Sequence, residues 1–167
     1  MSVRIGVECA LIALLTLTSS SCGGSRGVTP SVNQRAALSG SLPWNPLQWN
    51  VITTFADRRA ATMSVLYGND AAVRYARANS QQAYPAGSVI ALVTWTQQDD
   101  ARWFGGKIPG PVKSVEFVSV TGEADNKAVY SHEKYEGSPL RQTSVWNGNS
   151  PEARAAYLLS LRAAVLP

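Results

Sequence analysis

Few residues in this chain could do chemistry, and this narrows the possible reactions. There is a single histidine, His132, which lies between Ser131 and Glu133 in a polar stretch. A histidine can ligate a metal or a haem iron, but sites built on several histidines are excluded by this count. We favour an exposed histidine and keep ligation of a cofactor by His132 as the alternative.

A second candidate is Glu116, which is flanked by Val115 and Phe117 in an alternating stretch. A carboxyl group that points into a cavity has a raised pKa and can act as an acid or a base. A solvent-facing strand residue is the competing interpretation, and we favour it. The adjacent Asp99 and Asp100 are interpreted as a solvated turn, because neighbouring side chains in a loop diverge.

Aromatic residues supply the remaining pocket candidates. Trp95, Trp103, Phe104 and Tyr135 could wall a pocket for a small ligand, with Glu116 as its polar group. The competing interpretation places these rings in the core, which is the commoner use of tryptophan in a small domain. No group of residues has the spacing of a metal-ligand set, so no metal is expected.

The composition indicates one globular domain. Of the 167 residues, 45% are hydrophobic and 16% are charged, which excludes a disordered tail, and two cysteines are too few for a disulfide scaffold. The net charge is +4, but the basic residues do not form a stripe interleaved with aromatic residues. We therefore expect no binding to nucleic acid.

The N-terminal residues are typical of an export signal. Arg4 precedes an apolar run from Ala10 to Leu17 that is too short to span a bilayer. Small residues then precede Cys22, which resembles the bacterial lipoprotein signal whose cysteine receives a lipid. We expect an exported protein of the bacterial cell envelope that faces the periplasm and is anchored to a membrane by a lipid on Cys22. The alternative is simple cleavage that leaves Cys22 a free thiol.

Three parts of the chain follow from this interpretation. Residues 1–21 are expected to be the signal peptide, residues 22–30 a flexible tether rich in glycine, and residues 31–167 a single domain. Without residues 1–21 only Cys22 remains, so no internal disulfide is expected.

The order of the expected elements indicates an α+β fold with a largely antiparallel sheet flanked by helices, because most connections between strands are too short for parallel crossovers. In the alternating strand, Glu116, Val118 and Val120 face one side, while Val115 and Phe117 face the other. The apolar strand at 87–96 is expected at the centre of the sheet. Strands are expected at 49–55, 61–67, 87–96, 113–121 and 128–135, helices at 31–38, at 70–79 and from Ser150, and a long irregular loop at 97–111.

Successive blocks of the chain resemble the cytochrome P-460 family. After a start at Trp49, the blocks are Leu66–Val73 (LYGNDAAV), Tyr84–Ile90 (YPAGSVI) and Val115–Val118 (VEFV), and the resemblance extends to Leu140. It implies an exported bacterial protein with a largely antiparallel sheet flanked by helices. The best-known members carry a c-type haem, attached through a C-x-x-C-H motif and cross-linked to a lysine, and they oxidise hydroxylamine.

This sequence departs from the family pattern at the haem. It contains no C-x-x-C-H motif, because its cysteines are Cys9 and Cys22 and its histidine is His132. No covalently attached haem is therefore expected, non-covalent haem stays open as a cofactor, and no catalytic residue is carried over from the family.

Three functions remain open on the sequence. The favoured one is a binding or sensory module that holds a small apolar or planar ligand in the cavity that haem occupies in its relatives. The second is a redox protein with non-covalent haem that acts on a small nitrogen compound such as hydroxylamine. The third is an envelope scaffold lipoprotein whose loop at 97–111 contacts a protein partner.

Overall fold

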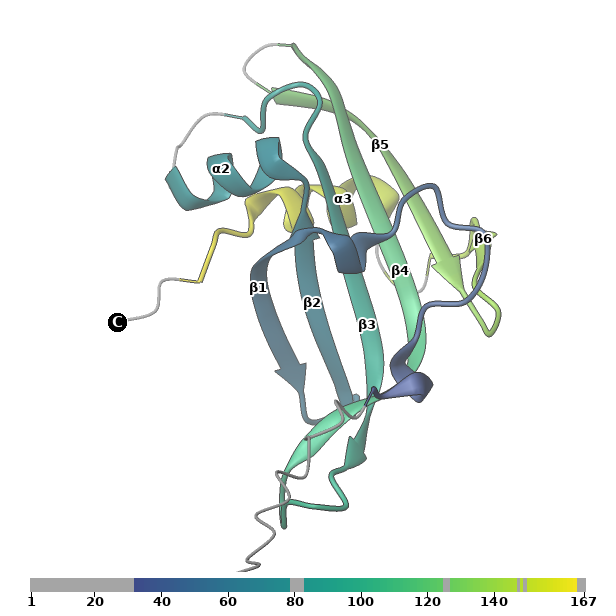
Figure 1. Ribbon diagram of the computed structural model, residues 1–167. Helices are drawn as coiled ribbons and strands as arrows, with labels where there is room; N and C mark the ends of the chain where they lie inside the picture. Colours follow the sequence, from purple (N-terminus) through teal and green to yellow (C-terminus); the bar gives the residue numbers. More distant parts are fainter. Residues whose placement is uncertain (1–31, 79–82, 125–126, 147, 149, 165–167) are drawn as a thin grey trace, which may run out of the picture. The chain divides into compact units, whose positions relative to one another are not determined.

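The computed structural model describes residues 32–78, 83–124, 127–146, 148 and 150–164 (Figure 1). The expected signal peptide, Cys22 and the tether lie outside these ranges. From Asn33 onward the chain forms one compact unit. Within the described ranges, no helix has the length and apolar character needed to cross a membrane.

The unit is built on a six-stranded antiparallel sheet in which every strand pairs with its neighbour in the sequence, in the order β1-β2-β3-β4-β5-β6. This confirms the α+β class and the antiparallel sheet, and it places the apolar strand β3 in the interior of the sheet. The strands are β1 (Asn50–Asp57), β2 (Thr62–Gly68), β3 (Val89–Asp99), β4 (Lys107–Ala124), β5 (Lys127–Glu136) and β6 (Arg141–Thr143). The helices are α2 (Asp70–Ala78) and α3 (Pro151–Ser160), with two 3-10 turns, η1 (Gln34–Ala36) and η2 (Pro46–Gln48).

The irregular loop expected over 97–111 is confined to residues 100–106, and the strand residues on either side of it correct the expectation. The ladder between β3 and β4 continues to the pair Asp99↔Lys107. Pro109 and Pro111 suggested a loop, but they precede Ser114, where the pairing of β4 with β5 begins. Before Ser114, the edge of β4 that faces away from β3 has no neighbouring strand. Proline lacks an N–H group, and on this edge no hydrogen bond to a strand is lost.

Two further expectations need correction. The helix expected at 31–38 is only the 3-10 turn η1, and the short strand β6 was not expected at all. β6 has three residues and no alternating pattern, so pairing with β5 specifies it and its own composition does not.

Asn69 sets the start of α2 and joins it to the next strand. Its Oδ1 accepts hydrogen bonds from the N–H groups of Ala72 at 3.0 Å and Val89 at 3.2 Å, and its Nδ2 donates to the carbonyl of Gly87 at 2.8 Å. Asp70 adds a negative charge at the positive end of the helix dipole. One side chain therefore ties the beginning of the helix to the turn before β3.

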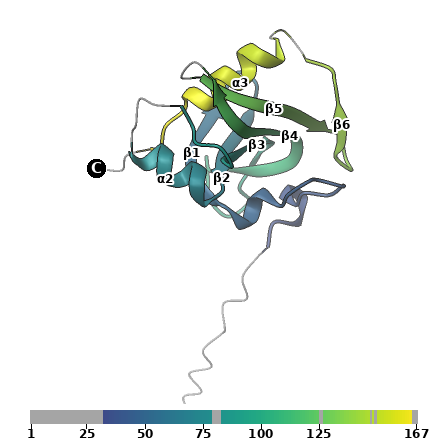
Figure 2. The ribbon, with the colours of Figure 1, turned by 90° about the horizontal axis from the view of Figure 1, so that it is seen from above.

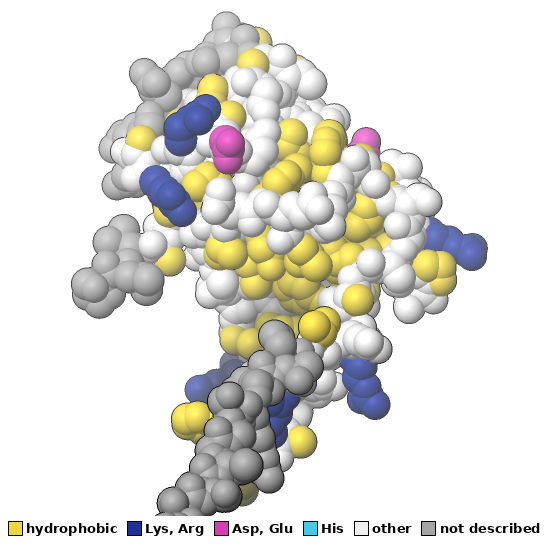
Figure 3. Space-filling model, viewed as in Figure 1, with side chains coloured by type: hydrophobic (Ala, Val, Ile, Leu, Met, Phe, Trp, Pro, Cys, Tyr) yellow, Lys and Arg dark blue, Asp and Glu magenta, His cyan; other side chains and the backbone are white. Residues whose placement is uncertain are grey.

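The alternation of side chains along the strands gives the sheet two different faces. One face shares a core with α2 and α3, and the segment from 33 to 49 covers part of the other (Figure 2). Hydrophobic side chains gather over the middle of this second face (Figure 3). The first core contains Ile52, Leu66, Ile90, Leu92, Val118 and Val120 with Ala72, Val73, Ala155 and Leu158; the second contains Ala91, Val93, Trp95, Val115, Phe117, Tyr135 and Leu140.

Polar contacts hold the segment from 33 to 49 on the second face. Trp95 Nε1 donates to the carbonyl of Ala36 at 2.9 Å, and Leu140 N donates to the carbonyl of Ser39 at 2.7 Å. Gly40 forms an isolated bridge with Leu140, at a φ of +126°. This positive φ favours glycine, because the backbone there approaches Leu140 too closely for a side chain.

Candidate ligand-binding site

A cavity of ≈ 260 Å³ lies on the helix face of the sheet and borders on α3. It occupies the part of this face where the strands present hydroxyl and charged groups in place of the apolar core. The hydroxyl residues are Thr62, Thr94 and Ser114, the charged residues are Lys113, Glu116, Lys134, Glu136 and Arg154, and Ala60 and Trp146 complete the lining.

The register of the strands explains this change from apolar to polar. Ser114 and Glu116 lie on the same face of β4 as Val118, and Ser114 pairs with Thr94 of β3. Thr94 in turn pairs with Ser64 of β2, and their hydroxyl oxygens are 2.9 Å apart. One end of the helix face is therefore a polar surface formed by three neighbouring strands.

Glu116 and Arg154 form the centre of the site. The Nε and Nη2 groups of Arg154 each donate to one carboxylate oxygen of Glu116, both at 2.9 Å. Glu116 is 5% exposed, so this bidentate ion pair is shielded from water. Ser150 caps α3 by accepting from the N–H of Ala153 at 3.1 Å, and the buried Ala155 fixes the helix on the sheet, which directs Arg154 toward β4.

His132 supports the carboxylate from the neighbouring strand β5. Its Nδ1 lies 3.0 Å from the carbonyl oxygen of Pro151, so this nitrogen carries a proton and donates. Its Nε2 lies 3.4 Å from Glu116 Oε2 and is buried with no hydrogen-bond partner among the described residues, so this contact attracts the carboxylate only when Nε2 also carries a proton. The ring packs against Trp146 with 4.3 Å between centroids, and the side chain is 4% exposed. The favoured interpretation of His132 as an exposed residue is therefore wrong.

Lys134 brings a second cation to the cavity, and this one is buried. Its Nζ lies 2.7 Å from Glu136 Oε1 and donates to the carbonyl of Val145 at 3.2 Å. The same Nζ is 5.6 Å from the centre of the Trp146 ring, within the range of a cation–π interaction. Lys134 is therefore held at the cavity wall by a carboxylate, a carbonyl and an aromatic face.

The surroundings keep Glu116 ionised. Burial by itself raises the pKa of Glu116, but the contacts with His132 and Arg154 outweigh it and lower this pKa from 4.5 to about 2. Glu116 is therefore neither the solvent-facing residue favoured on sequence nor an acid of raised pKa. It is a buried carboxylate that neutralises the arginine beside it.

This pKa predicts acid sensitivity. Because the pKa of Glu116 is lower in the folded protein than in the unfolded chain, its contribution to stability is complete above about pH 4.5 and is lost as the pH falls toward 2. The difference between the ordinary pKa of 4.5 and the pKa of about 2 in the folded protein corresponds to about 3 kcal/mol of folding stability. Urea unfolding between pH 7 and pH 2.5 should show that wild type loses more stability than Glu116→Gln, which carries no charge in either state. Equal losses in the two proteins would show that Glu116 does not titrate in this way.

The structure does not bring the sequence candidates together. Of the five pocket candidates, only Glu116 lines the cavity. Trp95 and Tyr135 belong to the core on the opposite face of the sheet. Trp103 is 75% exposed and Phe104 105% exposed, and both lie between β3 and β4. The tryptophan at the cavity is Trp146, which was not singled out.

Sequence reasoning also missed Arg154 and Lys134. A signal for Lys134 was present in the alternation of β5. Lys134 pairs with Glu116 of β4, and His132, two residues earlier, pairs with Val118. A charged residue opposite another on one face of two paired strands favours a shared site. Arg154 had no such signal, because its partner is 38 residues away in the sequence.

The residues around the cavity do not fit a histidine-ligated haem. Both ring nitrogens of His132 face protein oxygens, one from Pro151 and one from Glu116, and its ring is covered by Trp146. A haem iron needs a nitrogen lone pair that points into open space. The charged and hydroxyl side chains of the lining also differ from the apolar walls that a flat hydrophobic macrocycle needs.

Comparison with protein-family models finds a match to the model described as Cytochrome P460, over residues 47–143. The match covers more than half of the chain and includes all six strands of the sheet. A search of curated proteins finds no match to this chain.

Proposed function

This chain belongs to the cytochrome P460 family, and on that basis we propose that it is an exported, lipid-anchored member whose domain binds a small polar anion in place of haem. The family is haem-associated. The observation that carries the proposal is the cavity on the helix face of the sheet, whose charged lining includes the buried Glu116 and Lys134.

Charged residues gathered around one cavity, two of them buried, favour binding over a purely structural role. The lining contains three cationic residues, Lys113, Lys134 and Arg154, and two acidic ones, Glu116 and Glu136, so its formal charge is 3 − 2 = +1. Buried ion pairs contribute little net stability, because desolvation offsets their attraction. Their concentration around one cavity is typical of a binding site.

The hydrogen-bond inventory indicates what kind of ligand fits. Arg154 has five N–H donors, and two of them are directed at Glu116. Lys134 has three, and two are directed at Glu136 and Val145. Beyond these contacts, the described residues offer the two side chains only aromatic faces, Trp146 at 5.6 Å from Lys134 Nζ and Tyr157 at 5.5 Å from the guanidinium of Arg154. A ligand rich in acceptor oxygens, such as a carboxylate, would satisfy the other donors of these side chains.

Size and shape narrow the choice further. Pockets for drug-sized ligands measure about 300–1,000 Å³, and this cavity of ≈ 260 Å³ is smaller. The Trp146 ring provides a flat wall beside Lys134. We therefore propose a small carboxylate with a planar part, which revises the apolar ligand expected on sequence toward a polar one.

The proposal is tested with residues 23–167, which contain the whole compact unit. Sodium benzoate and sodium acetate serve as the probes, and binding is followed by tryptophan fluorescence and by the melting temperature. We expect benzoate to bind saturably and Lys134→Met to weaken its binding by about tenfold or more, the loss of one charge-assisted hydrogen bond. Lys107→Met is the matched control, because Lys107 is a lysine outside the cavity that pairs with Asp99.

A haem titration of the same protein separates this function from the redox alternative. A saturable Soret band that His132→Ala abolishes would overturn the proposal in favour of non-covalent haem. No response to either carboxylate, or equal binding by Lys134→Met and wild type, would also contradict it.

A further inference from the structure

The hairpin between β3 and β4 projects beyond the rest of the sheet (Figure 1). β2 ends its pairing with β3 at Thr62↔Thr96, whereas β3 and β4 remain paired to Asp99↔Lys107. The last part of the hairpin is therefore a two-stranded ribbon with no third strand. Register shifts between Thr94 and Gln97 add twist at its base.

The tip of this ribbon presents two adjacent aromatic side chains to solvent. Trp103 is 75% exposed and Phe104 is 105% exposed. Backbone hydrogen bonds from Gly106 N to Trp103 O at 2.9 Å and from Asp100 N to Gly106 O at 3.0 Å close the turn. Two large aromatic residues at the end of an ordered turn form an apolar surface that marks a contact site.

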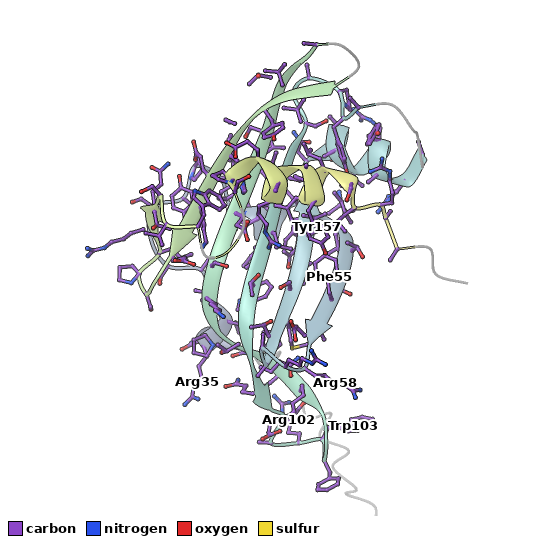
Figure 4. The ribbon with its side chains drawn as sticks, turned by 180° about the vertical axis from the view of Figure 1, so that it is seen from behind. Arg35, Phe55, Arg58, Arg102, Trp103 and Tyr157 are labelled. Carbon is purple, nitrogen blue, oxygen red and sulfur yellow. The ribbon has the colours of Figure 1, made fainter. Side chains whose placement is uncertain are left out.

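Basic residues surround this tip. Figure 4 shows Arg35 of η1, Arg58 of the turn after β1, Arg102 and Trp103 at the same end of the molecule, while Tyr157 of α3 lies away from it. The exposed residues of this end include five basic ones, Arg35, Arg58, Arg59, Arg102 and Lys107, and two acidic ones, Asp57 and Asp99, with the half-buried Asp100 as a third. The formal charge of the end is therefore 5 − 3 = +2.

The acidic residues of this end are already engaged. Asp57 accepts from the N–H groups of Arg59 at 2.8 Å and Ala60 at 3.0 Å, which fixes its own turn. Asp99 pairs with Lys107, and Asp100 accepts from the N–H of Arg102 at 2.8 Å. The three carboxylates keep their charges, and the end is positive because its basic residues outnumber its acidic ones by two.

The chain also enters the compact unit at this end. Asn33 Nδ2 donates to the carbonyl of Pro109 in β4 at 2.6 Å, so the first residue of the unit is bound to the ribbon. Cys22 lies 33 − 22 = 11 residues earlier in the sequence, a stretch that spans about 40 Å at most. A lipid on Cys22, which belongs to the function proposed above, would hold this end of the unit close to a membrane.

We propose that the tip formed by Trp103 and Phe104 docks on an anionic lipid surface, with Arg35, Arg58, Arg59 and Arg102 facing the headgroups. Aromatic rings are favoured at the boundary between headgroups and acyl chains. Each arginine near an anionic surface adds attraction. The position of the tip beside the attachment of the tether favours a bilayer over a protein partner. The docking orients the unit, with the ribbon toward the membrane.

The test uses residues 23–167, so that docking is measured without the lipid or the apolar segment before it. Binding is measured by cosedimentation with vesicles of phosphatidylglycerol and phosphatidylethanolamine, and with phosphatidylcholine vesicles for comparison. We expect binding to the anionic vesicles that weakens as salt is added. Replacing both Trp103 and Phe104 by alanine should lower the partition coefficient by about tenfold or more.

Val129→Ala is the matched control, because Val129 is an exposed hydrophobic residue on β5, outside this end. Its partition coefficient should equal that of wild type. Arg58→Gln with Arg59→Gln should weaken binding to anionic vesicles and leave phosphatidylcholine unaffected. Equal partitioning of the Trp103 and Phe104 double variant and wild type, or no binding at low salt, would overturn the proposal and leave the tip to a protein partner. Equal binding to both vesicle types would overturn the anionic surface as the docking partner. None of these results depends on Cys22 or on the cavity, so the proposed function stands or fails separately.

Discussion

Arg154→Met is expected to destabilise the protein by about 3 kcal/mol at pH 7, because it leaves the carboxylate of Glu116 buried without its bidentate partner. Methionine keeps most of the volume of the arginine stem, so lost packing contributes little. His132 remains beside the carboxylate, but at 3.4 Å its Nε2 makes no hydrogen bond that could replace the two from Arg154. Urea unfolding followed by circular dichroism measures the difference.

A second variant separates charge from packing. Glu116→Gln combined with Arg154→Met removes both charges, and it should recover most of the stability lost by Arg154→Met alone. Arg74→Met, at an exposed position of α2, is the control and should change the stability by less than about 0.5 kcal/mol. Two results would contradict this prediction. One is a free energy of unfolding for Arg154→Met equal to that of the control, and the other is a double variant no more stable than Arg154→Met alone.

Gly40→Ala is the second change with a large expected effect, a loss of about 3 kcal/mol or more. A Cβ at this position would lie 2.3 Å from the carbonyl oxygen of Leu140 and 2.9 Å from its nitrogen, and the φ of +126° disfavours any L side chain. Both neighbours are backbone atoms, so a side-chain rotation would not relieve the overlap. The bridge to Leu140 and the hydrogen bond from Leu140 to Ser39 should break together.

Gly87→Ala provides the comparison for this prediction. Gly87 also has a positive φ, of +81°, but nothing lies within 4 Å of an added Cβ. We expect Gly87→Ala to cost about 1 kcal/mol, from backbone strain alone. The difference between the two variants in thermal unfolding then measures the steric clash at Gly40. Similar melting temperatures for the two variants would show that the segment from 33 to 49 can shift to relieve the clash without lowering the stability of the protein.

Much of the fold was predictable from local patterns. The alternation at Val115, Glu116, Phe117 and Val118 correctly assigned the two faces of β4, because a strand has a fixed period of two. Ser150 and Pro151 correctly marked the start of α3, where Ser150 caps the helix. These signals are confined to a few neighbouring residues.

The errors have a common physical cause, which is dependence on distant parts of the chain. β3 and β4 extend through a stretch that contains Gly110, Pro109 and Pro111, because the two strands support each other. The cavity was missed because Arg154 reaches it from α3, a helix with no sequence link to β4. Glu116 was taken as solvent-facing because an isolated charge in a strand usually is, and its partner was not visible in the sequence.

The order of the sheet also has a kinetic consequence. Since every strand pairs with the strand before it, each hairpin closes between neighbours in the sequence, and loop-closure entropy stays small at every step. Contacts between distant parts of the chain are made at both ends of the unit. Near the C-terminus, Ala164 N donates to the carbonyl of Ile52. In the segment from 33 to 49, Trp95 meets Ala36 and Leu140 meets Gly40. These long loops close only after β3 and the region around Leu140 have formed. The sheet can therefore assemble strand by strand, whereas the segment from 33 to 49 and the C-terminal residues 161–164 join it after their distant partners have formed.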